Sequence, residues 1–265
     1  MLRPVRNVLR PVRNVLRPAR NALRPARNAD TRPLKALMRG LFVTGTDTGV
    51  GKTVVAGAIV AALRTRGERV AAFKPVVTGT DEPARPGWPP DHELLAAAAG
   101  ASVHAVAPHV FGPPVSPHLA AELAGVELDL VALVEAACSS LAENGADVLV
   151  AEGVGGLLVP LTPHHIVRDL AVALGLPLIV VARPGLGTIN HTLLTLEAAR
   201  AAQLAIAGAV MTPWPDEPGV MEHSNRATVA RLGAVSVATL APLADGSPES
   251  LAAGGVGLPL DDWLP

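Results

Sequence analysis

The chain has 265 residues, a formal net charge of -1 and 49% apolar residues. That length allows one substantial domain with a sizeable core, plus a tail. The longest apolar stretch, residues 170–182, is interrupted by Gly175 and Pro177 and is shorter than the roughly 20 residues that a membrane-spanning helix needs. The single cysteine, Cys138, permits neither an internal disulfide nor a thiolate metal cluster. We therefore expect a cytoplasmic protein without a membrane partner, in which Cys138 is a small helix residue rather than a nucleophile.

Charge is divided unevenly along the sequence. Residues 1–37 hold ten of the 22 Lys and Arg residues but one of the 23 acidic residues, which leaves 12 basic and 22 acidic residues in 38–265. Non-specific binding of nucleic acid depends on clustered cations that neutralise phosphates. The acidic body of the chain therefore argues against a nucleic acid partner.

Residues 2–29 form a tandem repeat, Leu-Arg-Pro-Val-Arg-Asn-Val twice and Leu-Arg-Pro-Ala-Arg-Asn-Ala twice. Each copy contains a proline, which removes a helix hydrogen bond, so we do not expect a coiled coil. We predict a disordered basic tail over residues 1–37 and a folded domain over residues 38–265. The tail has two interpretations, a basic arm for anionic lipid or nucleic acid and a repeated DNA tract translated ahead of a true start at Met38, and we favour the second.

From Gly40 onward, short apolar runs alternate with stretches of helical periodicity, which is typical of an α/β protein with a mostly parallel sheet. The apolar runs are nearly continuous, so we expect helices on both faces of the sheet. We predict strands at 41–45, 70–74, 148–152, 178–182 and 206–211, helices at 52–66, 91–99, 117–124, 129–144, 166–174 and 190–203, a loop at 78–90 and a glycine-rich turn at 153–156.

The segment Gly-Thr-Asp-Thr-Gly-Val-Gly-Lys-Thr, residues 45–53, lies between the first predicted strand and the first predicted helix. A Gly-Lys-Thr ending in that context is typical of a P-loop, in which backbone N–H groups and a helix N-terminus bind phosphate. The loop is one residue longer than the common spacing. We predict a single domain of the P-loop NTPase type, with nucleotide contacts from Thr48, Gly49, Val50, Gly51, Lys52 and Thr53.

Three charged residues lie where such a fold binds ligands. Lys74 ends the second predicted strand, at the sheet edge that α/β proteins use for ligands; a surface lysine extending off a strand end is the alternative. Glu152 ends an apolar strand, where an unpaired carboxylate is costly. Asp91 opens a helix and is alternatively an ordinary N-cap. Because magnesium prefers few protein oxygens together with phosphates and waters, we predict a Mg²⁺ site, beside the nucleotide, from Thr53, Asp91 and Glu152.

Several separated segments resemble the dethiobiotin synthetase family. They are Val-Thr-Gly-Thr-Asp-Thr-Gly-Val-Gly-Lys-Thr at 43–53, Phe-Lys-Pro-Val-Val-Thr-Gly-Thr at 73–80, Val-Ser-Pro-His at 115–118, Glu-Gly-Val-Gly-Gly at 152–156 and Leu-Gly-Thr-Ile-Asn-His at 186–191. The resemblance covers residues 40–243 and implies a homodimer. It also implies ATP-dependent carboxylation and ring closure of 7,8-diaminononanoate (7,8-diaminopelargonate) with CO₂ to give dethiobiotin, a step of biotin biosynthesis.

The resemblance implies a reaction through a carbamate and a mixed carbamic-phosphoric anhydride, without a protein nucleophile. Lys52 and Lys74 are the implied catalytic residues, which stabilise charge on the phosphoryl oxygens; we expect their replacement by alanine to stop synthesis and leave the fold intact. Thr78, Gly155 and Asn190 are the implied substrate contacts, with Asn190 reaching across the dimer to the substrate carboxylate. The alternatives are an N-cap for Asn190 and a flexible turn for Gly155.

The residues expected at the nucleobase depart from the family pattern. After the predicted strand 206–211, many relatives have an asparagine that pairs with both a donor and an acceptor of adenine, whereas this chain has Thr212. A threonine hydroxyl cannot make that two-point contact. We therefore expect Thr212 and Pro242 at the base, and another nucleoside triphosphate, CTP first, to be used about as well as ATP or better.

The main alternative from another class is an ATPase switch of the ParA/MinD kind, which shares the fold. Its loop carries a signature lysine four positions before the last glycine, where this chain has Asp47, and such a switch has no evident use for Lys74. A GTPase would need an Asn-Lys-x-Asp motif, and no lysine follows Lys74. We expect His118 to be structural, and His164 and His165 have no metal-ligand spacing and receive no role.

Overall fold

The computed structural model describes residues 39–83 and 86–264. All of them belong to one compact unit, as expected for a single α/β domain. The repeat at residues 2–29, its predicted disorder and the proposed start at Met38 lie outside the described residues. None of the helices in the described ranges combines the length and the apolar character that crossing a bilayer requires.

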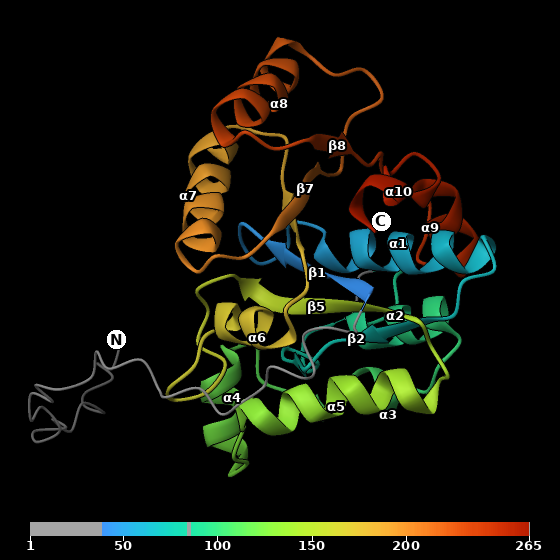
Figure 1. The fold of residues 1–265 in the computed structure, drawn as a ribbon, viewed down its shortest axis with the longest axis vertical. Coiled ribbons are helices and arrows are strands. Elements are labelled where there is room, and N and C mark those ends of the chain that lie inside the picture. The colour runs from blue at the N-terminus through green and yellow to red at the C-terminus, as the bar shows by residue number, and fades with distance from the viewer. Residues whose placement is uncertain (1–38, 84–85, 265) are drawn as a thin grey trace, which may run out of the picture. The chain divides into compact units, whose positions relative to one another are not determined.

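Six strands form the central sheet: β1 (Arg39–Gly45), β2 (Val70–Phe73), β5 (Val148–Gly156), β6 (Leu178–Ala182), β7 (Ile206–Met211) and β8 (Val237–Thr239). Their spatial order is β2-β5-β1-β6-β7-β8 (Figure 1). All neighbouring strands run parallel, so their carboxyl ends lie at one edge of the sheet. A separate parallel pair consists of β3 (Val76–Val77) and β4 (His109–Val110).

Helices cover both faces of this sheet, as the nearly continuous apolar strands predict. Leu41 of β1 belongs to a core on one face with residues of α1, α2, α9 and α10, whereas the next residue, Phe42, packs on the other face with residues of α4, α5 and α6. The helices are α1 (Lys52–Thr65), α2 (Asp91–Ala99), α3 (Val103–Val106), α4 (Pro117–Ala124), α5 (Leu130–Glu143), α6 (Val167–Leu174), α7 (Thr188–Ala201), α8 (Val220–Gly233), α9 (Pro248–Gly255) and α10 (Leu260–Trp263).

The second strand ends one residue before its predicted end, at Phe73, so Lys74 follows β2. Two other boundaries near the carboxyl edge differ from the prediction by two residues or more. Residues 153–156, predicted as a turn, continue β5, because Gly156 pairs with Gly45 of β1 beyond a register shift. α7 begins at Thr188, two residues before the predicted start, and its N-cap is Gly187. The sequence pattern also does not predict the short elements β3, α3 and β4, nor the elements α8, β8, α9 and α10 that follow β7.

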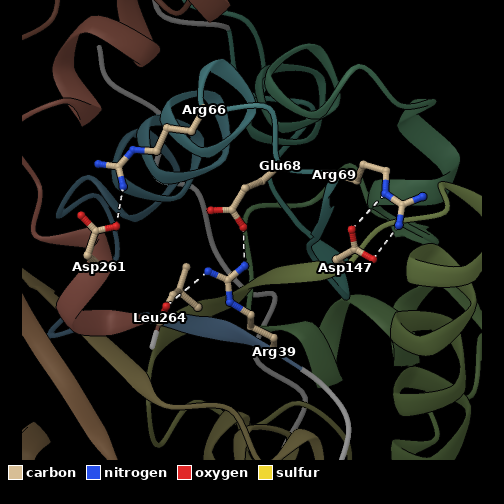
Figure 2. Close-up of polar contacts among 7 residues, drawn as sticks. All are labelled: Arg39, Arg66, Glu68, Arg69, Asp147, Asp261 and Leu264. Atoms are coloured by element: carbon tan, nitrogen blue, oxygen red, sulfur yellow. Dashed lines mark hydrogen bonds and ion pairs between the residues drawn. The ribbon is translucent and has the colours of Figure 1, made fainter.

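The opposite edge of the sheet, where the strands begin, carries exposed ion pairs (Figure 2). Arg39, the first residue of β1, pairs with Glu68 and donates to the carbonyl of Leu264 at 3.2 Å. Arg69 and Asp147, which precede β2 and β5, make a two-point contact at 2.7 and 2.9 Å. Arg39 thus connects the end of the described chain to its first strand, and Arg69 connects the segments that lead into β2 and β5.

A chain that starts at Met38 is expected to melt at the same temperature as the full chain and to keep its activity. Such a chain retains Arg39 and all of β1, and with them the described contacts of this edge. Thermal unfolding and an activity assay of the two chains side by side test this expectation. A fall of several degrees after truncation would show that the repeat contributes to the folded domain.

Candidate functional site

The loop between β1 and α1 has the backbone shape of a phosphate-binding loop. Gly49 and Gly51 have φ values of 70° and 94°, which residues with a Cβ rarely adopt. A Cβ on Gly45 would lie 2.8 Å from Val50 Cγ2 and 3.0 Å from Lys52 Cδ. The first turn of α1 contains no acidic residue, so the positive end of the helix dipole is available to an anion.

Lys52 lies in this loop with its side chain largely buried. Its exposed fraction is 7%, and Nζ donates to the backbone carbonyl of Asp47 at 2.9 Å. Burial lowers the pKa of Lys52, and the charge of Glu152 acts against that shift; phosphate oxygens would favour the charged ammonium further. Thr48 is exposed, whereas Val50 is 1% exposed.

Lys74 lies among the three oxygen-bearing side chains predicted to bind magnesium. Its Nζ donates to Glu152 Oε1 at 2.8 Å, to Thr53 Oγ1 at 3.3 Å and to Asp91. The Thr53 hydroxyl also donates to Glu152 Oε1 at 2.9 Å. Asp91 is the first residue of α2 and not its N-cap, which is Pro90. Residues from α1, α2, β5 and the end of β2 thus meet at one point.

The charges of this cluster are buried to different degrees. Lys74 is 4% exposed and Glu152 is 0% exposed, whereas the side chain of Asp91 is 52% exposed. Burial alone would lower the pKa of Lys74, but Glu152 and Asp91 outweigh it and the pKa is raised. Burial raises the pKa of Glu152, with Lys74 acting against it. We therefore expect Lys74→Ala to lower the stability of the fold, in place of the earlier expectation of no effect, because Glu152 would lose its buried counter-charge.

The cluster also fits a magnesium ion. Glu152 Oε2 is buried and has no hydrogen-bond partner among the described residues. Such an oxygen is costly without a donor or a cation. Within the part of the chain that the structure describes, no group of three or more His, Cys, Asp or Glu side chains is arranged to hold a metal. Two carboxylates and the Thr53 hydroxyl nevertheless suit Mg²⁺, which takes its remaining oxygens from phosphates and water.

A cavity of about 990 Å³ opens onto this cluster, a volume at the upper end of the range for small-molecule sites. One of its lining residues, Gly155, was expected either in a flexible turn or at a close approach to substrate. In the structure Gly155 is a strand residue with φ of 62°, and a Cβ there would lie 2.9 Å from Val159 Cγ2. Most of the predicted site residues line the cavity, namely Thr48, Gly49, Gly51, Lys52, Thr53, Lys74, Thr78, Asp91, Glu152 and Gly155.

Four predicted residues are not among those that line this cavity, and one of them is the buried Val50 described above. Thr212 is 3% exposed and packs against the phosphate loop, since a Cβ on Gly51 would lie 2.8 Å from its Cγ2. Pro242 is exposed after β8. Asn190 is exposed in the first turn of α7, and it is not the N-cap of that helix, which is Gly187. The cavity of a single chain therefore does not include Asn190.

Glu82 and Trp88 are among the residues that line the cavity and that sequence reasoning did not assign to the site. Both belong to the Gly/Pro-rich loop between β3 and α2, which has no periodicity to interpret. Gly246, before α9, packs beneath this loop, because a Cβ there would lie 3.3 Å from Trp88 Cε3. The sequence did give one signal for Trp88: it lies three residues before Asp91, which was a predicted site residue.

Two of the histidines considered above lie beside a hydroxyl group, and the cysteine is partly buried. His118 Nδ1 lies 3.0 Å from Ser116 Oγ, and His165 Nδ1 lies 3.1 Å from Thr162 Oγ1. Cys138 is partly buried in α5, and burial raises the pKa of its thiol. A thiol that stays protonated is a poor nucleophile, which agrees with the interpretation of Cys138 as a helix residue.

Comparison with known proteins agrees with this geometry. Residues 39–247 match the AAA domain family. The ATP-dependent dethiobiotin synthetase BioD of Anaeromyxobacter dehalogenans strain 2CP-1 is 50% identical over 199 residues, which cover 74% of this chain and 86% of that protein. The protein of the same name from Nitrosospira multiformis is 43% identical, over 73% of this chain and 84% of that protein. The one from Mycobacterium sp. strain JLS is 42% identical, over 80% of this chain and 91% of that protein. The chain therefore belongs to the ATP-dependent dethiobiotin synthetase family.

Proposed function

We propose that the chain synthesises dethiobiotin in an ATP-dependent step of biotin biosynthesis, from 7,8-diaminononanoate and CO₂. The observation that carries this proposal is the meeting of Lys74, Thr53, Asp91 and Glu152 beside the phosphate loop, in one cavity with Thr78. The relatives named above are synthetases with the same ATP dependence. We place the activity in the cytoplasm, a reducing compartment that suits an unpaired cysteine.

The proposed reaction needs no protein nucleophile. An uncharged amine attacks CO₂ and loses a proton, which leaves a carbamate. A carbamate oxygen takes the γ-phosphoryl group of ATP, and ADP departs. The second amine attacks the carbonyl carbon of this anhydride and gives up a proton, phosphate leaves with the bonding electrons, and the five-membered ring closes.

The protein's part is to bind and to stabilise charge. Lys52, at the start of α1, would hold the terminal phosphates of ATP. The Lys74 ammonium, which its raised pKa keeps charged, would turn from Asp91 to the carbamate and phosphoryl oxygens. Thr78, partly buried after β3, would contact the diamine. Positioning and charge stabilisation of this kind account for most catalysis of phosphoryl transfer.

Magnesium held by Thr53, Asp91 and Glu152 would neutralise phosphate charge. Glu152→Gln is expected to raise the magnesium concentration needed for half-maximal binding of an ATP analogue by at least about tenfold, the scale seen when a metal site loses a supporting group. Calorimetric titration with magnesium measures this. Glu143→Gln, an exposed carboxylate at the end of α5, is the control. An unchanged titration of Glu152→Gln would contradict its role as a ligand.

A homodimer would complete the substrate site. Asn190 is exposed, and its neighbours Leu186 and Leu194 are 94% and 56% exposed. A second copy that covers this surface would bury both leucines and bring Asn190 to the substrate carboxylate in the partner's cavity. Analytical ultracentrifugation is expected to give the mass of two chains. A monomer at working concentrations would contradict the assembly.

We expect Thr212 to make the site less selective for adenine than that of many relatives. Its side chain is buried against the phosphate loop, and its hydroxyl cannot make the two-point contact that an amide makes with adenine. CTP is expected to compete for the site about as well as ATP or better, as measured by competition binding of ATP, CTP and GTP. Thr212→Asn should shift the preference toward ATP about tenfold, and Thr212→Ser should not. A strong preference of the unaltered chain for ATP would contradict this expectation.

The ATPase switch of the ParA/MinD kind is less well supported, because Asp47 occupies the position of its signature lysine and the relatives are synthetases. The two functions differ in what triggers release of ADP. A synthetase is expected to release ADP only when diamine and bicarbonate are both present. ATP turnover at the same rate without the diamine would favour the switch.

A further inference from the structure

The phosphate loop is tied to the segment that leads into α7. The Asp47 carboxylate accepts a hydrogen bond from the Thr48 N–H at 2.7 Å through Oδ1, and one from Arg183 Nη2 at 3.2 Å through Oδ2. Arg183 follows β6 directly, at the same carboxyl edge of the sheet as the loop. Neither Asp47 nor Arg183 is among the residues that line the cavity. The pair therefore joins two loops without belonging to the substrate site.

A second contact holds the same segment from α8. Asn225 is 7% exposed, and its Nδ2 donates to the carbonyls of Pro184 at 2.8 Å and Gly185 at 3.2 Å. α7 begins soon afterwards, at the buried residue Thr188. Residues 183–187 thus have one buried attachment to α8 and one exposed attachment to the phosphate loop.

The two attachments differ in how a bound nucleotide would affect them. The amide of Asn225 is buried and hydrogen-bonded, so it is costly to displace. The side chains of Arg183 and Asp47 are 57% and 55% exposed, and exposed ion pairs are weak. A triphosphate bound at Lys52 brings several negative charges near Asp47, which repel its carboxylate and attract the guanidinium of Arg183. Nucleotide binding should therefore weaken or change the ion pair between Arg183 and Asp47. The hydrogen bonds from Asn225 should stay in place.

We propose that Asp47 and Arg183 are positioning residues that couple nucleotide binding to the substrate-binding end of α7. A change in the phosphate loop passes from Asp47 to Arg183 and from there to the segment that places Asn190. This inference rests on the proposed function, which puts the substrate carboxylate at Asn190. In the proposed homodimer Asn190 serves the partner's cavity, so the coupling runs between the two active sites.

The coupling is measured as the dissociation constant of 7,8-diaminononanoate, determined by calorimetry on the full chain without nucleotide and with a saturating non-hydrolysable ATP analogue and magnesium. For the unaltered chain we expect the analogue to change this constant about two- to fivefold, a size that one exposed ion pair can transmit. In Arg183→Met and in Asp47→Asn the two constants are expected to become equal within error. Arg183→Lys, which keeps a cation, should retain part of the difference.

Arg69→Met is the matched control, because it breaks an ion pair of similar exposure at the opposite edge of the sheet (Figure 2); it should keep the full coupling. The double variant Asp47→Asn/Arg183→Met should behave like either single variant, since all three remove the same contact. Full coupling in Arg183→Met, or none in the unaltered chain, would overturn the inference. Failure of the unaltered chain to bind the diamine at all would instead contradict the proposed function.

Discussion

Lys74→Ala is expected to slow dethiobiotin synthesis about 100- to 1000-fold, the loss typical of removing one preorganised charge from a transition state. Lys74 is the buried cation between Glu152 and Asp91 that would face the carbamate and phosphoryl oxygens. The rate is measured as product formed at saturating ATP and diamine. Affinity for ATP should change much less, because Lys52 and the loop remain. Near-normal turnover would show that the assignment of Lys74 is wrong.

The same substitution is also expected to lower the melting temperature by about 5 °C or more. Removing one partner of a buried ion pair costs about 3–5 kcal/mol, and each kcal/mol shifts the melting temperature of a domain of this size by about 2–4 °C. Glu152 can reduce the cost by binding a proton, which its raised pKa favours. Lys74→Met/Glu152→Gln, which removes both buried charges, should recover stability but not synthesis. Recovery of synthesis as well would show that Lys74→Ala acts through folding.

Lys52→Ala is expected to weaken ATP binding at least about tenfold, since a charge-assisted contact to the phosphates is lost, and to slow synthesis about 100-fold. The melting temperature should change little, because the contact that Lys52 makes in the structure is to the neutral carbonyl of Asp47. Binding of a fluorescent ATP analogue measures the first effect.

The control for Lys52 is Arg66→Ala, which removes a cation at the other end of α1, where Arg66 pairs with Asp261 on the surface (Figure 2). ATP affinity and synthesis should both stay within about twofold of the unaltered chain, since exposed ion pairs contribute little. Equal losses in the two variants would mean that the effect of Lys52→Ala does not arise at the phosphate site.

The central strands and the helices between them can be predicted because each carries one strong local signal, a continuous apolar run or a helical apolar stripe. The end of β5 cannot be predicted in this way. It continues as a strand because Gly156 pairs with Gly45, a contact between distant residues that glycine's low strand propensity conceals. α8 has three buried residues, Asn225, Val229 and Gly233, so its sequence shows little of an amphipathic pattern.

For the site, the sequence predicts which residues lie at the ends of strands and near the phosphate loop. It does not predict which of these side chains contact one another, because those contacts depend on the fold. Lys74 is buried against Glu152 because β2 and β5 are neighbours, with Phe73 paired to Ala151. The apolar runs do not predict the order of the strands in the sheet. For that reason the sequence also did not predict that losing Lys74 would lower the stability of the fold. Asn190 remains a prediction, because its proposed contact belongs to a second copy of the chain.

The identity of the product tests the proposed function most directly. The full chain is incubated with 7,8-diaminononanoate, magnesium, ATP and ¹³C-labelled bicarbonate, and the products are identified by mass spectrometry. We predict dethiobiotin with the label in its ureido carbonyl, together with equal amounts of ADP and phosphate. Turnover of ATP without labelled dethiobiotin would contradict the assignment of this chain as a dethiobiotin-forming enzyme.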